Sequence, residues 1–258
     1  MTRNILGYSA YAKSLTDCAN EMVAASADGA RTCKAMACLN PHSYVVARTD
    51  QPFSTALHTM DWLIPDGTGV VKAAKWLGKP LNGRVTGPDV FEQTLRIQNA
   101  NGGSVFFLGA SEETLTKIRE RLAREFPNIT LAGTYSPPYK PEFSDADNTA
   151  MIAAVNAASP DLLWVGMTAP KQEKWIAQHR DDLNVGAAGA IGAAFDFFAG
   201  TVKRSHPIFR KTGLEWLPRL LQQPRRLWRR MFVSAPLFLA DVAREKMKPG
   251  TIVATPKN

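Results

Sequence analysis

The stretch Trp62–Val71, WLIPDGTGVV, joins two apolar segments through a carboxylate and two glycines. The first segment has the length and bulky side chains of a buried strand, and the second opens a run with helical spacing. A buried strand that turns directly into a helix is typical of α/β proteins. The stretch therefore predicts a strand-to-helix junction with Asp66 at the turn, where its carboxylate either caps the helix or serves a binding site.

The same alternation of short apolar runs and amphipathic stretches recurs along the first two hundred residues. Helices are expected at 41–60, after Ser111, near 145–158 and from 168 onward. Strand and helix in alternation predict an α/β fold with a mostly parallel sheet covered by helices. The expected strands span residues 34–40, 62–67, 102–111, 128–135, 161–167 and 184–192.

Polar or small residues follow the ends of several expected strands. The carboxyl ends of parallel strands share one edge of the sheet, and ligands bind beyond that edge. Helix N-termini there point free N–H groups at the same space, which suits a diphosphate. The residues expected at this edge are Asn40, Asp66, Gly109, Thr168 and Gly192.

The C-terminal part of the chain carries all of the excess positive charge. Residues 201–258 contain 13 Lys and Arg against 3 Asp and Glu (+10), residues 1–200 contain 18 against 20 (−2), and the sum is the net +8. We therefore divide the chain into an α/β core, residues 1–200, and a basic helical appendage, residues 201–258. The appendage mixes arginines with apolar residues between prolines at 207, 218, 224 and 236.

This mixture predicts short amphipathic helices that lie on an anionic membrane surface. The arginines would meet lipid headgroups, and apolar side chains would dip into the interface. The apolar side chains expected to do so are Trp216, Trp228, Phe232, Leu237, Phe238 and Leu239.

The N-terminus has no apolar core of the kind a secretory signal needs, and no stretch approaches the roughly 18 uninterrupted apolar residues of a spanning helix. A cytoplasmic protein, bound peripherally to the inner face of the cell membrane, is expected. The cysteines, Cys18, Cys33 and Cys38, show no zinc-ligand spacing and are expected as reduced thiols. No metal site is expected, because no D-x-D triplet follows a strand and the D-A-D at 145–147 lies in a polar stretch.

Several sequence blocks together carry a family resemblance. They are ACLNPHSYVVART, LIPDGTGVV, GRVTGPDV, FFLGAS, GMTAPKQEKW, GAIGAAFDFFAGTVKRSHP and GLEWLPRLLQQPRR, in this order. The chain after residue 30 resembles the WecG/TagA/CpsF glycosyltransferases, glycosyltransferase family 26. The resemblance implies a Rossmann-like core with a membrane-targeting appendage. Ser205–Pro207, where relatives commonly have R-A-P, and Cys38, where some have Thr, depart from the family pattern.

The resemblance also implies an activity. Members transfer a sugar with inversion from a UDP-sugar to a polyprenyl-diphosphate-linked sugar, in bacterial surface polysaccharide synthesis. The UDP-sugar is a substrate, and neither a metal nor another cofactor is implied. The transferred sugar is N-acetylmannosamine, its uronic acid, or glucose, and the sequence does not choose among them.

The family pattern assigns roles to single residues of this chain. Asp66 matches the proposed catalytic base, which takes a proton from the acceptor hydroxyl. Asn40 and Gln172 match substrate-binding residues, and Arg84 matches an active-site arginine thought to bind phosphate. Positions thought to fold over the site as a phosphate-binding lid correspond to Arg219, Arg225 and Arg226.

Plainer explanations stay open for these residues. Asp66 and Asn40 are also good helix caps, Gln172 and Glu173 suit an exposed first helical turn, and Arg84 suits the surface. The turn Gly109–Ser111 could hold the donor diphosphate through backbone N–H groups, although tight turning alone explains the glycine. Tyr135 could stack on uracil, and a packing role explains it equally well.

The expected partners are a UDP-sugar donor, a polyprenyl-diphosphate-linked sugar acceptor and an anionic inner-membrane surface, and a homo-oligomer stays open. The competing class is a Rossmann-type methyltransferase or other nucleotide-binding enzyme with a basic membrane- or nucleic-acid-binding tail. The junction Leu39–His42 lacks the glycine fingerprint of the dinucleotide-binding enzymes. No nucleic-acid partner is expected, because the tail carries no recognised binding motif.

Overall fold

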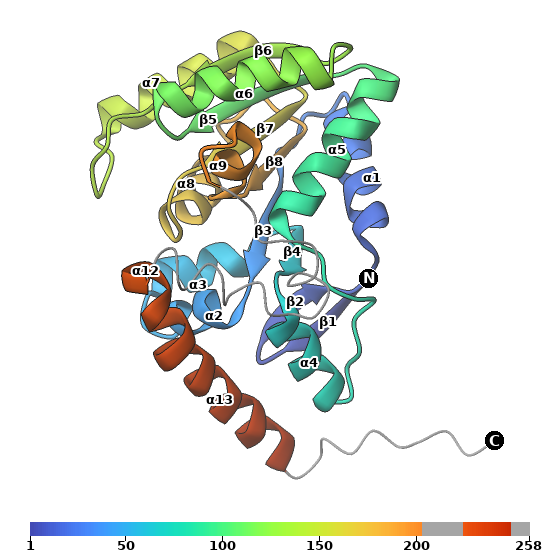
Figure 1. Cartoon of the computed structure of the whole chain (residues 1–258), viewed down its shortest axis with the longest axis vertical. Coiled ribbons are helices and arrows are strands. Elements are labelled where there is room, and N and C mark those ends of the chain that lie inside the picture. Colours follow the sequence, from blue (N-terminus) through green and yellow to red (C-terminus); the bar gives the residue numbers. More distant parts are fainter. Residues whose placement is uncertain (203–223, 249–258) are drawn as a thin grey trace, which may run out of the picture.

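Strand residues point alternately to two separate cores, which is why the sheet needs helices on both faces. In the strand Leu162–Gly166, Leu162 and Trp164 join one core, and Leu163 and Val165 join the other. The computed structural model describes residues 1–202 and 224–248. Within these residues, eight strands form one sheet flanked by helices (Figure 1).

The strand order is β1-β2-β4-β3-β8-β7-β5-β6. All neighbouring strands are parallel except β1, which pairs antiparallel with β2. The predicted mostly parallel α/β sheet is confirmed. The strands are β1 (Thr2–Ile5), β2 (Tyr8–Tyr11), β3 (Lys34–Leu39), β4 (Trp62–Pro65), β5 (Ser104–Gly109), β6 (Thr130–Tyr135), β7 (Leu162–Gly166) and β8 (Ala187–Ala190).

One core lies under four helices that pack aromatic and aliphatic side chains on the sheet. Phe91 is its centre, with edge-on contacts to Trp164 and Phe198 at ring distances of 5.0 and 5.2 Å. The helices are α1 (Leu15–Ser26), α5 (Gly87–Asn101), α6 (Glu112–Glu125) and α9 (Ala194–Ala199).

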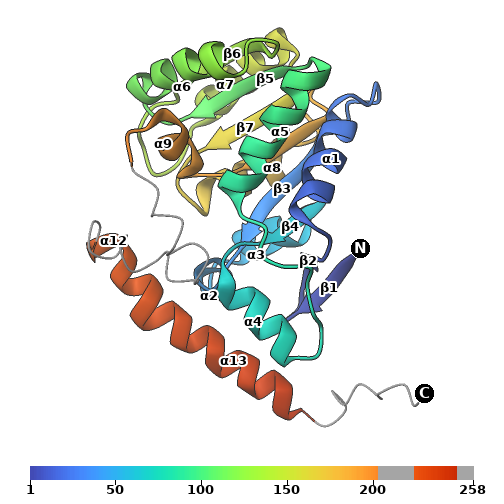
Figure 2. The same cartoon turned by 45° about the vertical axis from the view of Figure 1, so that its right-hand side comes forward.

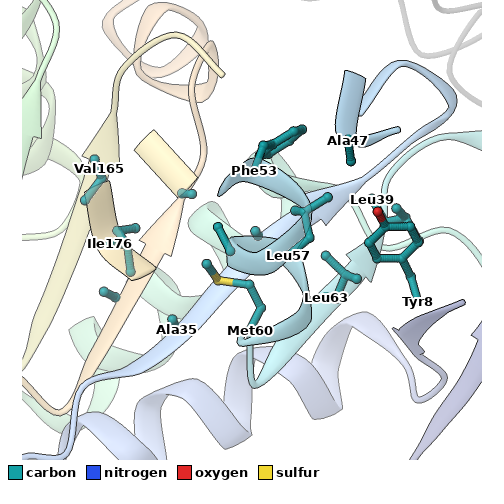
Figure 3. Packing of buried hydrophobic residues seen from close by; sticks show 14 of the residues in the cluster. Tyr8, Ala35, Leu39, Ala47, Phe53, Leu57, Met60, Leu63, Val165 and Ile176 are labelled. Carbon is teal, nitrogen blue, oxygen red and sulfur yellow. The ribbon is translucent and has the colours of Figure 1, made fainter. Parts of the chain in front are cut away.

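The other core includes residues of α3 and α8, and Figure 3 shows Phe53, Leu57 and Ile176 within it. A C-terminal helix also belongs to it, because Phe238 and Val242 are buried there. The helices of this core are α2 (Pro41–Ala47), α3 (Gln51–His58), α4 (Thr68–Trp76), α7 (Asp145–Ala158), α8 (Lys171–His179) and α13 (Ala235–Met247).

The expected single helix over 41–60 is wrong. The Asp50 carboxylate accepts a hydrogen bond from the Phe53 N–H at 3.0 Å and so caps a new helix, α3. Pro52 occupies the first turn of that helix, where its missing N–H is tolerated. The hairpin β1–β2 and the helix α1 were not among the expected elements.

The described appendage is a run of consecutive helices. α12 (Pro224–Arg229) leads into a π-helix, η1 (Arg230–Ser234), and then into α13. Pro236 does not break the run, because it lies in the first turn of α13. Figures 1 and 2 both show α13 beside α2 and α4, and it contacts both helices.

Phe238 is only 2% exposed and packs edge-on against Tyr44 at 5.4 Å between ring centroids. The expectation that Phe238 dips into a membrane is therefore wrong. Trp228, Phe232, Leu237 and Leu239 are exposed, and Trp216 lies outside the described residues.

Candidate active site

A pocket of about 280 Å³ lies at the carboxyl ends of β3, β4, β7 and β8. Of the residues predicted for this edge, Asn40, Asp66, Thr168 and Gly192 line it. Arg84 and Gln172 line it as well, together with residues that the sequence did not single out for function. Those residues include Cys38, His42, Thr86, Glu173 and Arg230.

Strand pairing brings Asn40 and Asp66 to the same place. Leu39 pairs with Pro65 in the parallel ladder, and the Asp66 N–H donates to the Leu39 carbonyl at 2.8 Å. The two polar residues therefore follow adjacent strand ends. Gly67, at φ +94°, occupies the N-cap of α4, so Asp66 is not the N-cap residue of that helix.

Asn40 does cap a helix. Its Oδ1 accepts from the His42 and Ser43 N–H groups at 3.0 and 2.9 Å, and the Ser43 hydroxyl accepts from the Asn40 N–H. In the described chain, the Asn40 Nδ2 makes no hydrogen bond. The cap fixes the Asn40 side chain at the wall of the pocket.

Gln172 ties two strand ends together. Its Oε1 accepts from the Met167 N–H at 3.1 Å and from the Gly192 N–H at 3.0 Å, just beyond β7 and β8. Its Nε2 donates to Glu173 Oε1 at 2.9 Å. Gln172 and Glu173 are 4% and 3% exposed, so the description of both as an exposed first turn of α8 is wrong.

Burial raises the pKa of Glu173 to about 7, against the weaker opposing effects of Gln172, Arg230 and Lys174. Within the described residues, Glu173 Oε2 has no hydrogen-bond partner. A buried carboxyl group in this position is unusual unless it serves a ligand or a neighbouring side chain. The P-K-Q-E block was the signal for it, because the sequence places Glu173 next to Gln172.

Arg84 lies in the loop before α5 and is partly buried, with 22% of its side chain exposed. Its Nη2 lies 3.9 Å from the Asp89 carboxylate. Asp89 itself accepts a hydrogen bond from the Thr86 hydroxyl at 2.6 Å at the start of α5. Arg84 is thus held at the pocket rather than spread on the surface.

The appendage contributes to the pocket through Leu227 and Arg230. Next to them, the Ser234 hydroxyl lies 2.9 Å from His42 Nδ1. Burial, together with Arg230 and Arg229, lowers the pKa of His42 to about 4, so this histidine is neutral at physiological pH. The sequence carried no local signal for either contact, because the partners are nearly two hundred residues apart.

Three predicted residues do not line this pocket. Gly109 ends β5, and a Cβ there would approach the Gly166 carbonyl oxygen to 2.5 Å, so close packing alone accounts for the glycine. Ser111 caps α6 by accepting from the Thr114 N–H at 3.3 Å. Tyr135 ends β6 and packs against the core that contains α7.

The predicted lid arginines are described only in part. Arg225 and Arg226 are residues of α12, and Arg219 lies outside the described residues. In residues 1–202 and 224–248, no three His, Cys, Asp or Glu side chains form a metal-binding group. In the same part of the chain, no helix combines the length and apolarity needed to span a bilayer.

The architecture and the pocket are typical of α/β enzymes, which bind ligands beyond the strand ends, and sequence comparison identifies the chain as a glycosyltransferase. The chain belongs to the glycosyl transferase WecG/TagA/CpsF family, whose model matches residues 3–251. The match begins before the motif blocks and includes all but the first residue of the β1–β2 hairpin.

The chain is also similar to N-acetylglucosaminyldiphosphoundecaprenol N-acetyl-beta-D-mannosaminyltransferases from Staphylococcus aureus. The proteins from strains MW2 and NCTC 8325 / PS 47 are both 32% identical to it over 209 residues. The matched region covers 81% of this chain and 79% of each relative.

Proposed function

We propose that the protein transfers a sugar, with inversion, from a UDP-sugar to a polyprenyl-diphosphate-linked sugar in bacterial surface polysaccharide synthesis. One observation carries the proposal: Asp66 and Asn40 line the same pocket from adjacent strand ends, with Arg84 and Arg230 also in its wall. This reaction needs a carboxylate for the acceptor, amides for sugar hydroxyls and cations for phosphate.

In the proposed mechanism, Asp66 takes the proton from an acceptor hydroxyl. The oxygen then forms a bond to the anomeric carbon of the donor sugar, while the bond from that carbon to UDP breaks. UDP leaves with the electron pair, and positive side chains stabilise its developing charge. Arg84 and Arg230 are candidates in the pocket, and Arg219, Arg225 and Arg226 are candidates for a lid.

The substrates are proposed from the relatives. The names of the Staphylococcus proteins specify an N-acetylglucosaminyl-diphosphate-undecaprenol acceptor and an N-acetylmannosaminyl group. We propose the same class of lipid-linked acceptor for this chain, and N-acetylmannosamine, its uronic acid or glucose as the transferred sugar. The proposed transferase needs no metal or other cofactor.

A lipid-linked acceptor places the reaction at a membrane, and the appendage fits that position. Trp228 and Phe232 are 58% and 53% exposed, and their rings contact each other in a tilted arrangement at 4.5 Å between centroids. Exposed basic residues accompany them in the appendage, namely Arg229, Arg244, Lys246 and Lys248. This combination favours an anionic interface. We propose a cytoplasmic protein bound peripherally to the inner face of the cell membrane.

The direct test is a donor screen. The full-length protein is incubated with each UDP-sugar and a short-chain polyprenyl-diphosphate N-acetylglucosamine, and the product is identified by mass spectrometry. A thermal-shift panel with UDP, S-adenosylhomocysteine, NAD and an oligonucleotide runs in parallel. Stabilisation by UDP alone is expected, and stabilisation by another compound without UDP binding would reject the proposed function.

A further inference from the structure

Gln172 has a nearly complete set of hydrogen bonds before any ligand arrives. A glutamine side chain offers two acceptor sites on Oε1 and two N–H donors on Nε2. Both acceptor sites are used by the Met167 and Gly192 N–H groups, and one donor is used by Glu173. In the described chain, one N–H of Nε2 is therefore the only hydrogen-bonding capacity that the Gln172 side chain retains.

The two backbone donors also decide which end of the amide carries the oxygen. Rotating it by half a turn would set Nε2 against the Met167 and Gly192 N–H groups, which are themselves donors. The remaining N–H of Gln172 can consequently donate to a ligand, and its oxygen cannot accept from one. Gln172 lines the pocket in which the sugar site is proposed.

Glu173 lies where its carboxylate orients this amide, and its side chain makes little other hydrogen bonding within the described residues. Its Oε1 accepts from Gln172, its Oε2 lacks a partner within the described residues, and the side chain is 3% exposed. Burying a carboxyl group with one oxygen unpaired destabilises a fold. A role in positioning Gln172 would explain why a carboxyl group lies in the wall of the pocket.

We propose that Glu173 is a positioning residue, which takes one N–H of the Gln172 amide so that the other is presented as a donor to an acceptor oxygen of a substrate sugar. The carbonyl of an N-acetyl group, a carboxylate or a hydroxyl oxygen satisfies this requirement. The inference rests on the proposed function, since it needs a sugar in the pocket.

The charged and titratable groups around Glu173 come from several elements. Arg230 of η1 and Lys174 of α8 favour the charged form of Glu173. The negative charges of Asp66 and Glu173 add to burial in raising the pKa of Cys38 of β3. A variant that keeps the size of Glu173 but removes its oxygens tests positioning with the least change to these neighbours. E173M does this, and E173Q is the matched variant that still offers an acceptor oxygen to Gln172.

The experiment compares wild type, E173Q and E173M in the full-length protein at pH 8. For E173M we expect KM for one of the two sugar substrates to rise about ten-fold, because the hydrogen bond from Gln172 to that sugar is lost. The same KM in E173Q should stay within about three-fold of wild type. The Kd for UDP without a sugar should stay within about two-fold of wild type in both. The melting temperature of E173M at pH 8 should equal or exceed that of wild type, because removal of a buried charge offsets the loss of the acceptor for Gln172 Nε2.

Two results would overturn the assignment. One is an E173M enzyme with both KM values unchanged, and the other is an E173M enzyme whose lower activity accompanies a lower melting temperature and weaker UDP binding, which indicates support of the fold. Failure of the proposed function looks different, because wild type itself would then neither transfer a sugar nor bind UDP.

Discussion

At the scale of single residues, Asp66 is the group on which the proposed chemistry depends. Asp66→Asn keeps the size and shape of the side chain but removes the proton acceptor. Transfer should fall by about 10²- to 10⁴-fold, the usual contribution of a general base, while UDP binding stays near wild type. Steady-state transfer and calorimetric UDP titration measure the two quantities. Asp145→Asn, at the exposed start of α7, is the control, and a D66N enzyme with most of its activity would show that the base is another group.

Glu173 makes a second prediction at this scale, which concerns stability. Burial raises its pKa from 4.5, the ordinary value of a glutamate carboxyl, to about 7 in the folded protein, so the folded state binds the proton more tightly than the unfolded state does. The free energy of unfolding that Glu173 contributes is therefore present at low pH and is lost as pH rises toward 7 and above. The full loss is about 3 kcal/mol for a shift of this size.

E173Q removes that titration and leaves all other groups in place. The difference in unfolding free energy between E173Q and wild type should grow in favour of E173Q from pH 5 to pH 8. Urea unfolding at both pH values measures it. A difference that does not change with pH would mean that Glu173 titrates as an exposed carboxyl group does.

At the scale of elements, α2 connects the pocket with the appendage. It begins just after its N-cap, Asn40, and its Tyr44 hydroxyl donates to Asp241 of α13 at 3.1 Å. Arg48, just after α2, lies 3.0 Å from the same carboxylate. Asp241 therefore joins α13 to the helix that carries one wall of the site.

Asp241→Ala should loosen α13 by about 1–3 kcal/mol, because it leaves the Tyr44 hydroxyl and Arg48 without their shared acceptor. Hydrogen–deuterium exchange of residues 235–247 should then become about ten-fold faster or more. Lys246→Ala, an exposed position on the same helix, is the control and should exchange as wild type does. Unchanged exchange in the Asp241 variant would show that apolar burial of Phe238 and Val242 alone holds the helix.

At the scale of the whole molecule, the exposed aromatic residues of the appendage should hold the protein on lipid. Replacing both Trp228 and Phe232 by Ser removes the two large side chains without touching the buried face of α13. Binding to phosphatidylserine-containing vesicles should weaken at least about ten-fold in a sedimentation assay. Tyr139→Ser, fully exposed in the segment between β6 and α7, controls for the loss of an aromatic residue.

Vesicles of phosphatidylcholine alone separate the two contributions to this binding. Wild type should bind them more weakly than anionic vesicles, because the basic residues then lack a partner. If the double variant sedimented with anionic vesicles as wild type does, the lipid-binding surface would lie elsewhere.

The sequence by itself predicted the alternation of strands and helices, because apolar periodicity reports directly on which faces are buried. It also predicted the junction at Asp66, since a carboxylate at the end of a buried run is visible in a short stretch. It failed where local signals compete. Residues 41–60 look like one helix until the Asp50 cap and Pro52 are weighed, and Pro236 looks like a break although it lies in a first helical turn.

Only the tertiary structure decided which residues share the pocket. Strand order places β3, β4, β7 and β8 together and leaves Gly109, Ser111 and Tyr135 at the ends of β5 and β6, toward one edge of the sheet. It also buries Glu173 in contact with Gln172 and brings Arg230 and Ser234 beside His42. The physical reason is that burial and contact between distant segments depend on how the whole chain packs, whereas periodicity and capping are properties of a few neighbouring residues.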